Sequence, residues 1–408
     1  MTEASAATGN ARESSWLRML QLSSIPTIEM GRLLGEVWSV AQKNSGLMPV
    51  RPNHLTYAGI AEAMLDHTFT LTMNALTGIP DREQMDLQRA EMRAVWGLME
   101  KGGWLDDPAS FHQQPPPVSD WTEERESTRV PSRLEFSRIS FDSEFEPRPG
   151  MPGTDRWMER HANRTHHAYV LEHEDGGDRP WLVCIHGFGM GSPTVNFTGF
   201  GAQYLHQTLG LNLIFPTLPL HGLRSTSSLS GGDLLHPDYV GLLHSFTQAI
   251  WDIRRTIQWV RDGGGETIGL YGLSLGGCNS ALVACLEEDL SCVIAGIPVV
   301  DFTRVARSNA PWVVDWYHSE STDWNLMSSV MRVVSPLALE PRLERDRRFI
   351  FAGRADRVVP PDQAHSLWTH WEQPDIHWYP GGHVFGFMTA DVRRFVEESL
   401  YQSDMVAA

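Results

Sequence analysis

The chain has 408 residues, of which 41% are hydrophobic and 20% are charged, a composition that excludes a largely disordered or fibrous protein. Its 33 Lys and Arg stand against 50 Asp and Glu, and the formal net charge of −17 argues against nucleic acid as a partner, because phosphate binding needs a basic surface. The length suits one large α/β domain with an extension, or two domains.

Cysteine usage and hydropathy favour a reducing compartment. Four cysteines are too few for a disulfide framework. Cys278 and Cys285 are spaced to share one helix face, which favours a core role over a metal site. The first fifteen residues contain no apolar stretch typical of a secretory signal, and no run of about 18 apolar residues follows. We therefore expect a cytoplasmic protein without an integral membrane span.

The first part of the chain has a helical pattern. Residues 1–15 are small and polar, and we expect a disordered tail there. Over residues 57–76, apolar side chains recur close to a period of 3.6, which predicts a helix with one apolar face. These side chains are Ile60, Met64, Leu65, Leu71 and Ala75.

A second helix is predicted to start at Asp81, directly after Pro80, and to end at Gly102-Gly103. Its apolar stripe favours core packing over a cofactor site. The stripe consists of Met85, Met92, Val95, Trp96 and Met99. The segment 112–119 has the proline-rich composition of a linker. We therefore expect a helical N-terminal region with its linker over residues 16–125.

Beyond the linker, strand and helix patterns alternate. Residues 134–145 alternate apolar and polar side chains, which indicates a half-exposed edge strand, and a second strand follows at 167–173. Apolar runs typical of buried parallel strands come next, at 181–185, 211–215, 267–273, 293–300, 348–352 and 376–379. Helix-length segments, such as 245–261 and 276–288, separate most of them. This alternation predicts an α/β fold with a mostly parallel sheet and helices on both faces.

Residues 303–343 interrupt the alternation, and we expect a helical cap inserted there. The segment is rich in large apolar side chains: Trp312, Trp316, Tyr317, Trp324, Met327 and Met331. They either form a lid over an acyl or aromatic pocket or pack the insert onto the sheet.

The strongest chemical signal is a serine between glycines, Gly272-Leu273-Ser274-Leu275-Gly276-Gly277. It follows an apolar strand and precedes a helical pattern. In such a turn the serine takes a strained backbone conformation, and glycine two residues before and two residues after it avoids a clash. Ser274 is therefore a candidate nucleophile at the C-terminal edge of the sheet, with the backbone N–H of Leu275 directed to the same place.

A second signal, His186-Gly187-Phe188-Gly189, follows the strand 181–185. A glycine-rich turn leaves backbone N–H groups unobstructed, and such donors stabilise the negative oxygen of a tetrahedral intermediate. The predicted oxyanion hole consists of the N–H groups of Phe188 and Leu275, and we expect His186 to order the loop. Glycine-rich loops also hold phosphates, but the Gly-Lys-Ser/Thr ending of a P-loop is absent.

Two further candidates follow predicted strands. Asp356 comes after the strand 348–352, and His383 comes after 376–379 in the sequence Tyr-Pro-Gly-Gly-His. The chain order Ser274, Asp356, His383 is that of the α/β-hydrolase triad. Asp301, which follows the strand 293–300, is the alternative carboxylate. His377 is the weaker alternative to His383.

Together these motifs resemble those of the α/β-hydrolases, most of all the esterase, dienelactone-hydrolase and prolyl-oligopeptidase-like branch. The resemblance covers about two thirds of the chain and implies an α/β-hydrolase domain over residues 126–404, with the cap 303–343 within it. The helical region before it has no counterpart in the family.

The resemblance implies a serine hydrolase that cleaves carboxylic esters or thioesters. Ser274 attacks an acyl carbonyl, His383 acts as general base and Asp356 orients the imidazole. A small-molecule acyl substrate is expected, with no metal and no organic cofactor. The alternatives are an acyltransferase or peptidase with the same triad, or a non-catalytic binding protein on this fold. Acyl length, leaving group and oligomeric state stay open.

Overall fold

The computed structural model describes residues 57–77, 81–129, 133–175, 178–236, 238–309 and 321–407. The predicted disordered tail, the helical pattern before residue 57, and Trp312, Trp316 and Tyr317 of the predicted cap lie outside these residues. Residues Tyr57–Ala408 belong to one compact unit.

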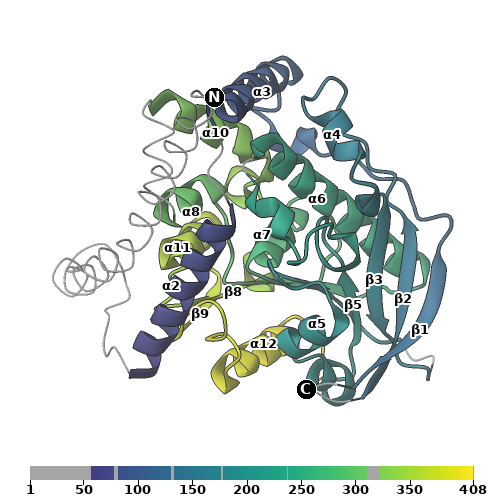
Figure 1. Cartoon of the computed structure of the whole chain (residues 1–408). Helices are drawn as coiled ribbons and strands as arrows, with labels where there is room; N and C mark the ends of the chain where they lie inside the picture. Colours follow the sequence, from purple (N-terminus) through teal and green to yellow (C-terminus); the bar gives the residue numbers. More distant parts are fainter. Residues whose placement is uncertain are drawn as a thin grey trace, which may run out of the picture. The chain divides into compact units, whose positions relative to one another are not determined.

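Nine strands of this unit form one mixed sheet (Figure 1). The strands are β1 (Thr122–Thr128), β2 (Leu134–Asp142), β3 (Thr165–Leu171), β4 (Trp181–Ile185), β5 (Asn212–Pro216), β6 (Ile268–Leu273), β7 (Cys292–Gly296), β8 (Arg348–Gly353) and β9 (Asp375–Tyr379). Their order across the sheet is β1-β2-β3-β5-β4-β6-β7-β8-β9. The pairs from β1 to β5 are antiparallel, and the pairs from β5 to β9 are parallel. The predicted mostly parallel sheet is confirmed.

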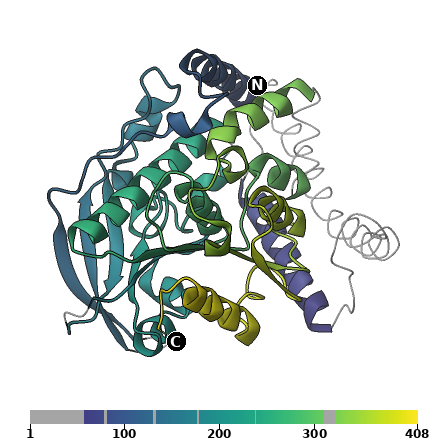
Figure 2. The same cartoon turned by 180° about the vertical axis from the view of Figure 1, so that it is seen from behind.

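Helices cover both faces of the sheet, as predicted (Figures 1 and 2). The covering helices are α5 (Pro193–Phe200), α6 (Tyr239–Asp262), α7 (Leu275–Val283), α10 (Ser321–Met331), α11 (Pro361–His370) and α12 (Ala390–Gln402). Side chains of β4 alternate between the faces. Val183 and Ile185 pack with α6, α7, α10 and α11, whereas Leu182 and Cys184 pack with α5 and α12. Both faces are buried, which is why the parallel strands have continuous apolar sequences.

The cysteines belong to these packed layers. All four are buried free thiols. Cys278 and Cys285 lie on α7 and its C-terminal end, in the same core cluster, so the core role predicted from their spacing is confirmed.

β1 is a strand that the sequence analysis did not predict. Its sequence is polar, and most of its residues are exposed at the edge of the sheet. Glu124 and Glu126 of β1 form ion pairs with Arg138 of β2, with nitrogen–oxygen distances of 2.7 Å in both cases. Charged side chains on an edge strand discourage pairing with other chains. The predicted boundary between residues 125 and 126 falls within this strand.

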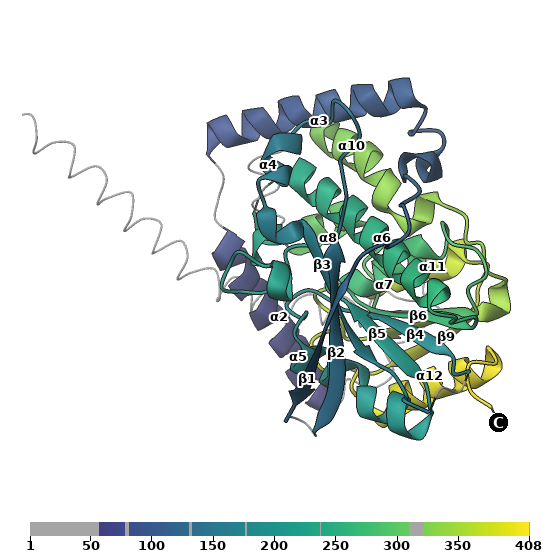
Figure 3. The same ribbon diagram turned by 90° about the vertical axis from the view of Figure 1, so that its right-hand side faces the viewer.

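Two helices precede the sheet in the chain, α2 (Tyr57–Thr77) and α3 (Arg82–Gly102). α3 starts and ends as predicted: Asp81 forms a capping box with Gln84, and Gly103 takes a left-handed conformation with φ of 73°. α3 lies against α6 and α10 (Figure 3), and Met92, Val95 and Met99 of its apolar stripe belong to a core cluster with residues of those helices. None of the helices in the described part of the chain is long and apolar enough to cross a membrane.

α2 does not bury the apolar face that its sequence pattern predicts. Met64 and Leu65 are 45% and 42% exposed, whereas Asp66 is 1% exposed. The expected burial is therefore wrong at these two positions. The side chains of Ile60 and Ala75 lie outside the described ones.

The predicted cap region contains α8 (Phe302–Asn309) and α10 in its described part. Trp324, Met327 and Met331 of α10 are buried in the core. Of the two roles considered for the apolar side chains of this segment, packing accounts for these three. The extent of a cap over residues 303–343 stays a prediction.

A buried ion pair anchors the loop that follows β5. Arg224 in this loop lies 2.8 Å from the carboxylate of Asp252 on α6, and both side chains are at most 1% exposed. The Arg224 guanidinium also donates hydrogen bonds to the carbonyl groups of Thr217 and Asn163. The loop is thereby attached to α6 and to the segment before β3.

Replacement of Asp252 with Asn should strongly destabilise the protein, because the buried guanidinium of Arg224 loses its counter-charge. We expect the free energy of unfolding to fall by about 3–5 kcal/mol, measured by denaturant unfolding. Glu135→Gln is the control, since it removes one partner of an ion pair with Arg133 in which both side chains are 76% exposed. It should change the same quantity by less than about 1 kcal/mol. Equal effects of the two substitutions would contradict the anchoring role.

Candidate active site

Ser274 lies in the sharp turn between β6 and α7 that its motif predicts. Its φ and ψ are 57° and −112°, a combination that residues other than glycine rarely adopt. The N–H of Ser274 donates to the carbonyl of Gly296, and its own carbonyl accepts from the N–H of Cys278. Hydrogen bonds to β7 and α7 therefore hold the serine in this strained conformation.

Glycine is required on both sides of the serine. A Cβ atom at Gly272 would lie 2.1 Å from the carbonyl oxygen of Gly276, and a Cβ atom at Gly276 would lie 1.8 Å from that of Ile185. Backbone atoms on both sides leave no room for any side chain. The steric reason given for the two glycines is confirmed.

The structure brings Ser274, His383 and Asp356 together. Nε2 of His383 lies 2.9 Å from Oγ of Ser274, and Nδ1 lies 2.7 Å from Oδ2 of Asp356. Oδ1 of Asp356 accepts the backbone N–H groups of Val358 and Val359, at 3.0 and 2.7 Å. In the tautomer that carries its proton on Nδ1, the imidazole donates to the carboxylate, and Nε2 can accept the serine proton.

The alternative residues lie in other environments. Asp301 accepts the backbone N–H of Arg304 at the start of α8, at 3.0 Å. Nε2 of His377 on β9 lies 3.2 Å from Oδ2 of Asp391 on α12. Across the described residues, no group of three or more His, Cys, Asp and Glu side chains is arranged to hold a metal ion. Of the two candidate histidines, His383 contacts Ser274, and of the two candidate carboxylates, Asp356 contacts His383.

The surroundings of His383 make its imidazole more basic. Burial lowers the pKa of His383, but the negative charges of Asp356 and Asp66 and the hydrogen bond to Asp356 outweigh burial. The net effect raises its pKa above the ordinary value. A more basic imidazole is better able to take the proton of Ser274.

The loop after β4 lies against the turn of Ser274. A Cβ atom at Gly187 would be 3.4 Å from the Cβ of Ser274. Within the described part of the chain, the backbone N–H groups of Phe188 and Leu275 have no hydrogen-bond acceptor. Unpaired N–H groups beside a nucleophile are suited to binding an oxyanion.

His186 joins the loop after β4 to the loop after β5. Its Nδ1 lies 2.9 Å from the carbonyl of Gly187, and its Nε2 accepts the backbone N–H of Leu218 at 3.1 Å. Burial, with a smaller contribution from His221, lowers the pKa of His186 to about 3. The imidazole is therefore neutral at physiological pH and orders the loop, as expected.

A carboxylate that the sequence analysis did not single out reaches two loops of the site. Asp66 of α2 accepts the backbone N–H groups of Arg357, His383 and Val384, at 3.0, 2.7 and 3.1 Å. Its partners are backbone N–H groups, which every residue except proline carries, so no sequence motif indicates the contact.

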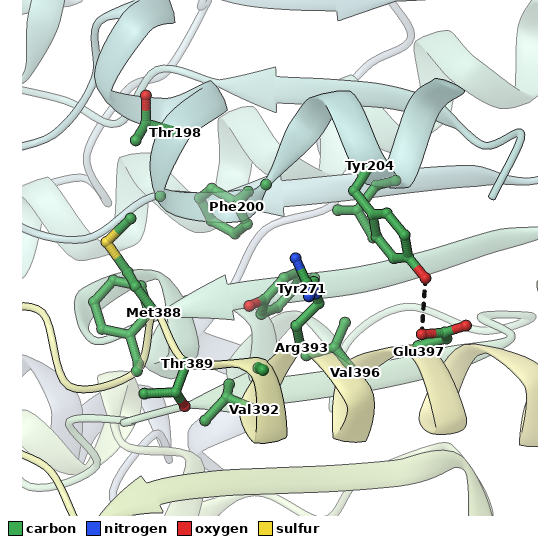
Figure 4. A pocket seen from close by; sticks show the side chains of 15 residues that line it. Thr198, Phe200, Tyr204, Tyr271, Met388, Thr389, Val392, Arg393, Val396 and Glu397 are labelled. Atoms are coloured by element: carbon green, nitrogen blue, oxygen red, sulfur yellow. Dashed lines mark hydrogen bonds between the residues drawn. The ribbon is translucent and has the colours of Figure 1, made fainter. Parts of the chain in front are cut away.

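A surface pocket of about 390 Å³ lies between α5 and α12 (Figure 4). Ser274, His383 and Asp356 do not line it. Tyr271 of β6 lines the pocket from the face of the sheet, whereas Ser274 stands beyond the end of the same strand. The pocket is separate from the candidate active site.

Gly276→Ala should disrupt the turn of Ser274, because the added methyl group would collide with the carbonyl of Ile185. We expect the free energy of unfolding to fall by about 3 kcal/mol or more, as in severe overpacking. The control is Gly97→Ala in α3, where an added Cβ meets nothing within 4 Å and helix propensity favours Ala by about 1 kcal/mol. Denaturant unfolding measures both, and unchanged stability in Gly276→Ala would refute the close packing of the turn.

No protein-family model matches the chain. The uncharacterized proteins MT2702 and Rv2627c of Mycobacterium tuberculosis are 37% and 36% identical to it over 415 aligned residues, which cover 99% of this chain and 98% of each relative. Among solved structures, acetyl xylan esterase 1 from Thermoanaerobacterium is similar, with a TM-score of 0.51 at 14% identity over 74% of this chain and 93% of that chain. The chain therefore belongs to the family of these two mycobacterial proteins, and its fold is that of the α/β-hydrolases.

Proposed function

We propose that the protein is a serine hydrolase that cleaves carboxylic esters or thioesters through an acyl-enzyme intermediate. The observation that carries this proposal is the line of hydrogen bonds from Ser274 through His383 to Asp356, with distances of 2.9 and 2.7 Å. The α/β-hydrolase fold hosts many functions and would not by itself support an activity. The strained serine and the basic imidazole add independent support, because both favour a reactive hydroxyl.

In the first step Ser274 acts as the nucleophile. Oγ bonds to the acyl carbon as its proton moves to Nε2 of His383, and Asp356 stabilises the resulting imidazolium through Nδ1. The imidazolium then gives the proton to the leaving alcohol or thiol as the bond between that group and the acyl carbon breaks. Ser274 is left as an acyl ester.

The oxyanion formed in this step needs hydrogen-bond donors. The backbone N–H groups of Phe188 and Leu275 are the proposed donors, because they flank Ser274 on the β4 loop and at the start of α7. One donor of this kind is typically worth about 3–4 kcal/mol of transition-state stabilisation.

In the second step water replaces the acyl group. His383 takes a proton from water, the hydroxide oxygen bonds to the acyl carbon, and the proton returns to Oγ of Ser274 as the acid leaves. An acyltransferase would use another hydroxyl, thiol or amine in place of this water.

A fluorophosphonate probe should label the protein at Ser274. We expect Ser274→Ala to abolish labelling and ester hydrolysis, because the hydroxyl that attacks is removed. Ser328→Ala is the matched control, since Ser328 lies on the exposed side of α10, and it should label like the wild-type protein. Labelling that persists in Ser274→Ala would exclude Ser274 as the nucleophile.

Hydrolysis should depend on the ionisation of His383. We expect kcat/KM to rise as the pH rises through the pKa of this residue, because only the neutral imidazole accepts a proton. Asp356→Asn should lower kcat by about 10⁴-fold, since the tautomer that leaves Nε2 free is no longer enforced. Both effects are measured with a panel of acyl esters, thioesters and peptide amides: kcat/KM of the wild-type protein is recorded against pH, and kcat is compared between the wild-type protein and Asp356→Asn. Turnover of amides without esters would favour the peptidase alternative.

A further inference from the structure

The carboxylate of Asp66 joins two loops that are distant in the sequence. Oδ2 accepts the N–H of Arg357, next to Asp356, and also the N–H of His383, while Oδ1 accepts the N–H of Val384. The side chain is 1% exposed. One buried group thus contacts both the loop of the acid and the loop of the base.

A carboxylate suits this position: burial raises the pKa of Asp66, and the hydrogen bonds from the three N–H groups oppose that shift because they favour the ionised form. Buried N–H groups need acceptors, and each one left without a partner costs about 1–3 kcal/mol. Hydrogen bonds to an ionised acceptor are about twice as strong as neutral ones. An amide in place of Asp66 would offer one acceptor oxygen and would turn its NH₂ donors toward the same N–H groups.

The glycines before His383 make room for α2. A Cβ atom at Gly382 would lie 2.8 Å from Oδ2 of Asp66, and a Cβ atom at Gly381 would lie 2.3 Å from Oε2 of Glu62. That same oxygen of Glu62 accepts the N–H of Gly382 at 2.7 Å. The Gly-Gly-His sequence therefore has a physical role: it lets two carboxylates of one helix approach the backbone of the loop.

The same helix also reaches the third loop of the site. The ring of Phe69 packs edge-on against that of Phe188, with a centroid distance of 6.5 Å and an interplanar angle of 75°. Phe69 lies three residues after Asp66, so the two side chains project from neighbouring positions on one helix face. α2 therefore contacts the acid loop, the histidine loop and the predicted oxyanion loop.

We infer that Asp66 is a positioning residue of the active site. We also infer that α2 helps to position the loops of that site through the contacts of Asp66, Glu62 and Phe69. The inference rests on the proposed function, since it assumes that the triad is catalytic. Asp66 fixes the distance between Asp356 and the imidazole of His383 through their backbones. It touches neither the substrate nor the hydroxyl of Ser274 in this role.

The charge of Asp66 has a measurable consequence at His383. Asp356 and Asp66 act on this imidazole, and Glu62 and Tyr379 form hydrogen bonds with Gly382, the residue before it. Burial, together with the nearby carboxylates, raises the pKa of Tyr379 well above its ordinary value, so its hydroxyl stays neutral and donates to the carbonyl of Gly382 at 2.9 Å. Asp356 and Asp66 both raise the pKa of His383. Removal of the Asp66 charge should therefore lower that pKa.

The test is Asp66→Asn in the full-length protein. We expect kcat/KM for ester hydrolysis to fall by about 10²-fold, as for a misplacement of catalytic groups by about 1 Å, and the acidic limb of its pH profile to move to lower pH. Thr68→Ala, on the exposed side of the same helix, should leave both unchanged. Glu62→Gln removes a charge from the same helix but keeps an acceptor for Gly382, and it should move the limb less than Asp66→Asn.

Asp66→Glu separates charge from geometry. It keeps the charge but lengthens the side chain by one methylene group, so we expect reduced turnover with the acidic limb near its wild-type position. Circular dichroism and thermal unfolding verify that each variant is folded. Should Asp66→Asn not fold, Asp66→Glu decides the matter, because wild-type turnover in that variant would overturn the positioning role.

A second measurement does not depend on activity. The pKa of His383 is measured by NMR in protein with isotope-labelled histidine, and its signal is assigned by its loss in His383→Asn. We expect a lower pKa in Asp66→Asn than in wild type. An unchanged pKa together with an unchanged rate of fluorophosphonate labelling would overturn the inference and leave the proposed function standing. Failure of the wild-type protein to react with the probe would instead overturn the proposed function.

Discussion

The imidazole of His383 lies between the hydroxyl of Ser274 and the carboxylate of Asp356, with hydrogen bonds of 2.9 and 2.7 Å, and these two contacts depend on much of the rest of the structure. The two partners come from loops after β6 and β8, and the imidazole comes from the loop after β9. Parallel strands end at one edge of a sheet, so the sheet delivers all three loops to the same place. Contacts outside the sheet fix the positions of the loops themselves.

Buried polar groups next to the loops supply these contacts. Backbone N–H groups orient Asp356, and the imidazole of His186 connects the loops after β4 and β5. The ion pair of Arg224 with Asp252 ties the second of these loops to α6. Each contact satisfies a buried donor or acceptor. Movement of a loop would break such a contact and leave a buried polar group without a partner, which costs free energy.

α2 extends this arrangement to the helical region that precedes the α/β-hydrolase domain. Its carboxylates Asp66 and Glu62 are directed at the loops, whereas two of its apolar side chains, Met64 and Leu65, are exposed. A helix that served only as a covering layer would bury its apolar stripe, as α3 does with Met92, Val95 and Met99. On α2 the pattern is inverted, because Asp66 is buried while Met64 and Leu65 are exposed.

Local and periodic patterns in the sequence were enough to predict several parts of the fold. Apolar runs identified the buried strands, because both faces of a parallel sheet are covered. The glycines around Ser274 identified its turn, because the backbone there excludes every Cβ. β1 was not predicted, since a strand that is exposed at the edge of the sheet does not need alternating apolar and polar residues.

The pairing of polar groups, in contrast, could not be predicted from such patterns and is seen in the folded protein. Asp356 and Asp301 both follow buried strands, and their sequences alone left both open as partners of His383. Asp66 and Glu62 bind backbone N–H groups, which have the same chemistry at almost every position and leave no trace in the pattern of side chains. Contacts of this kind exist only once distant segments are folded against one another.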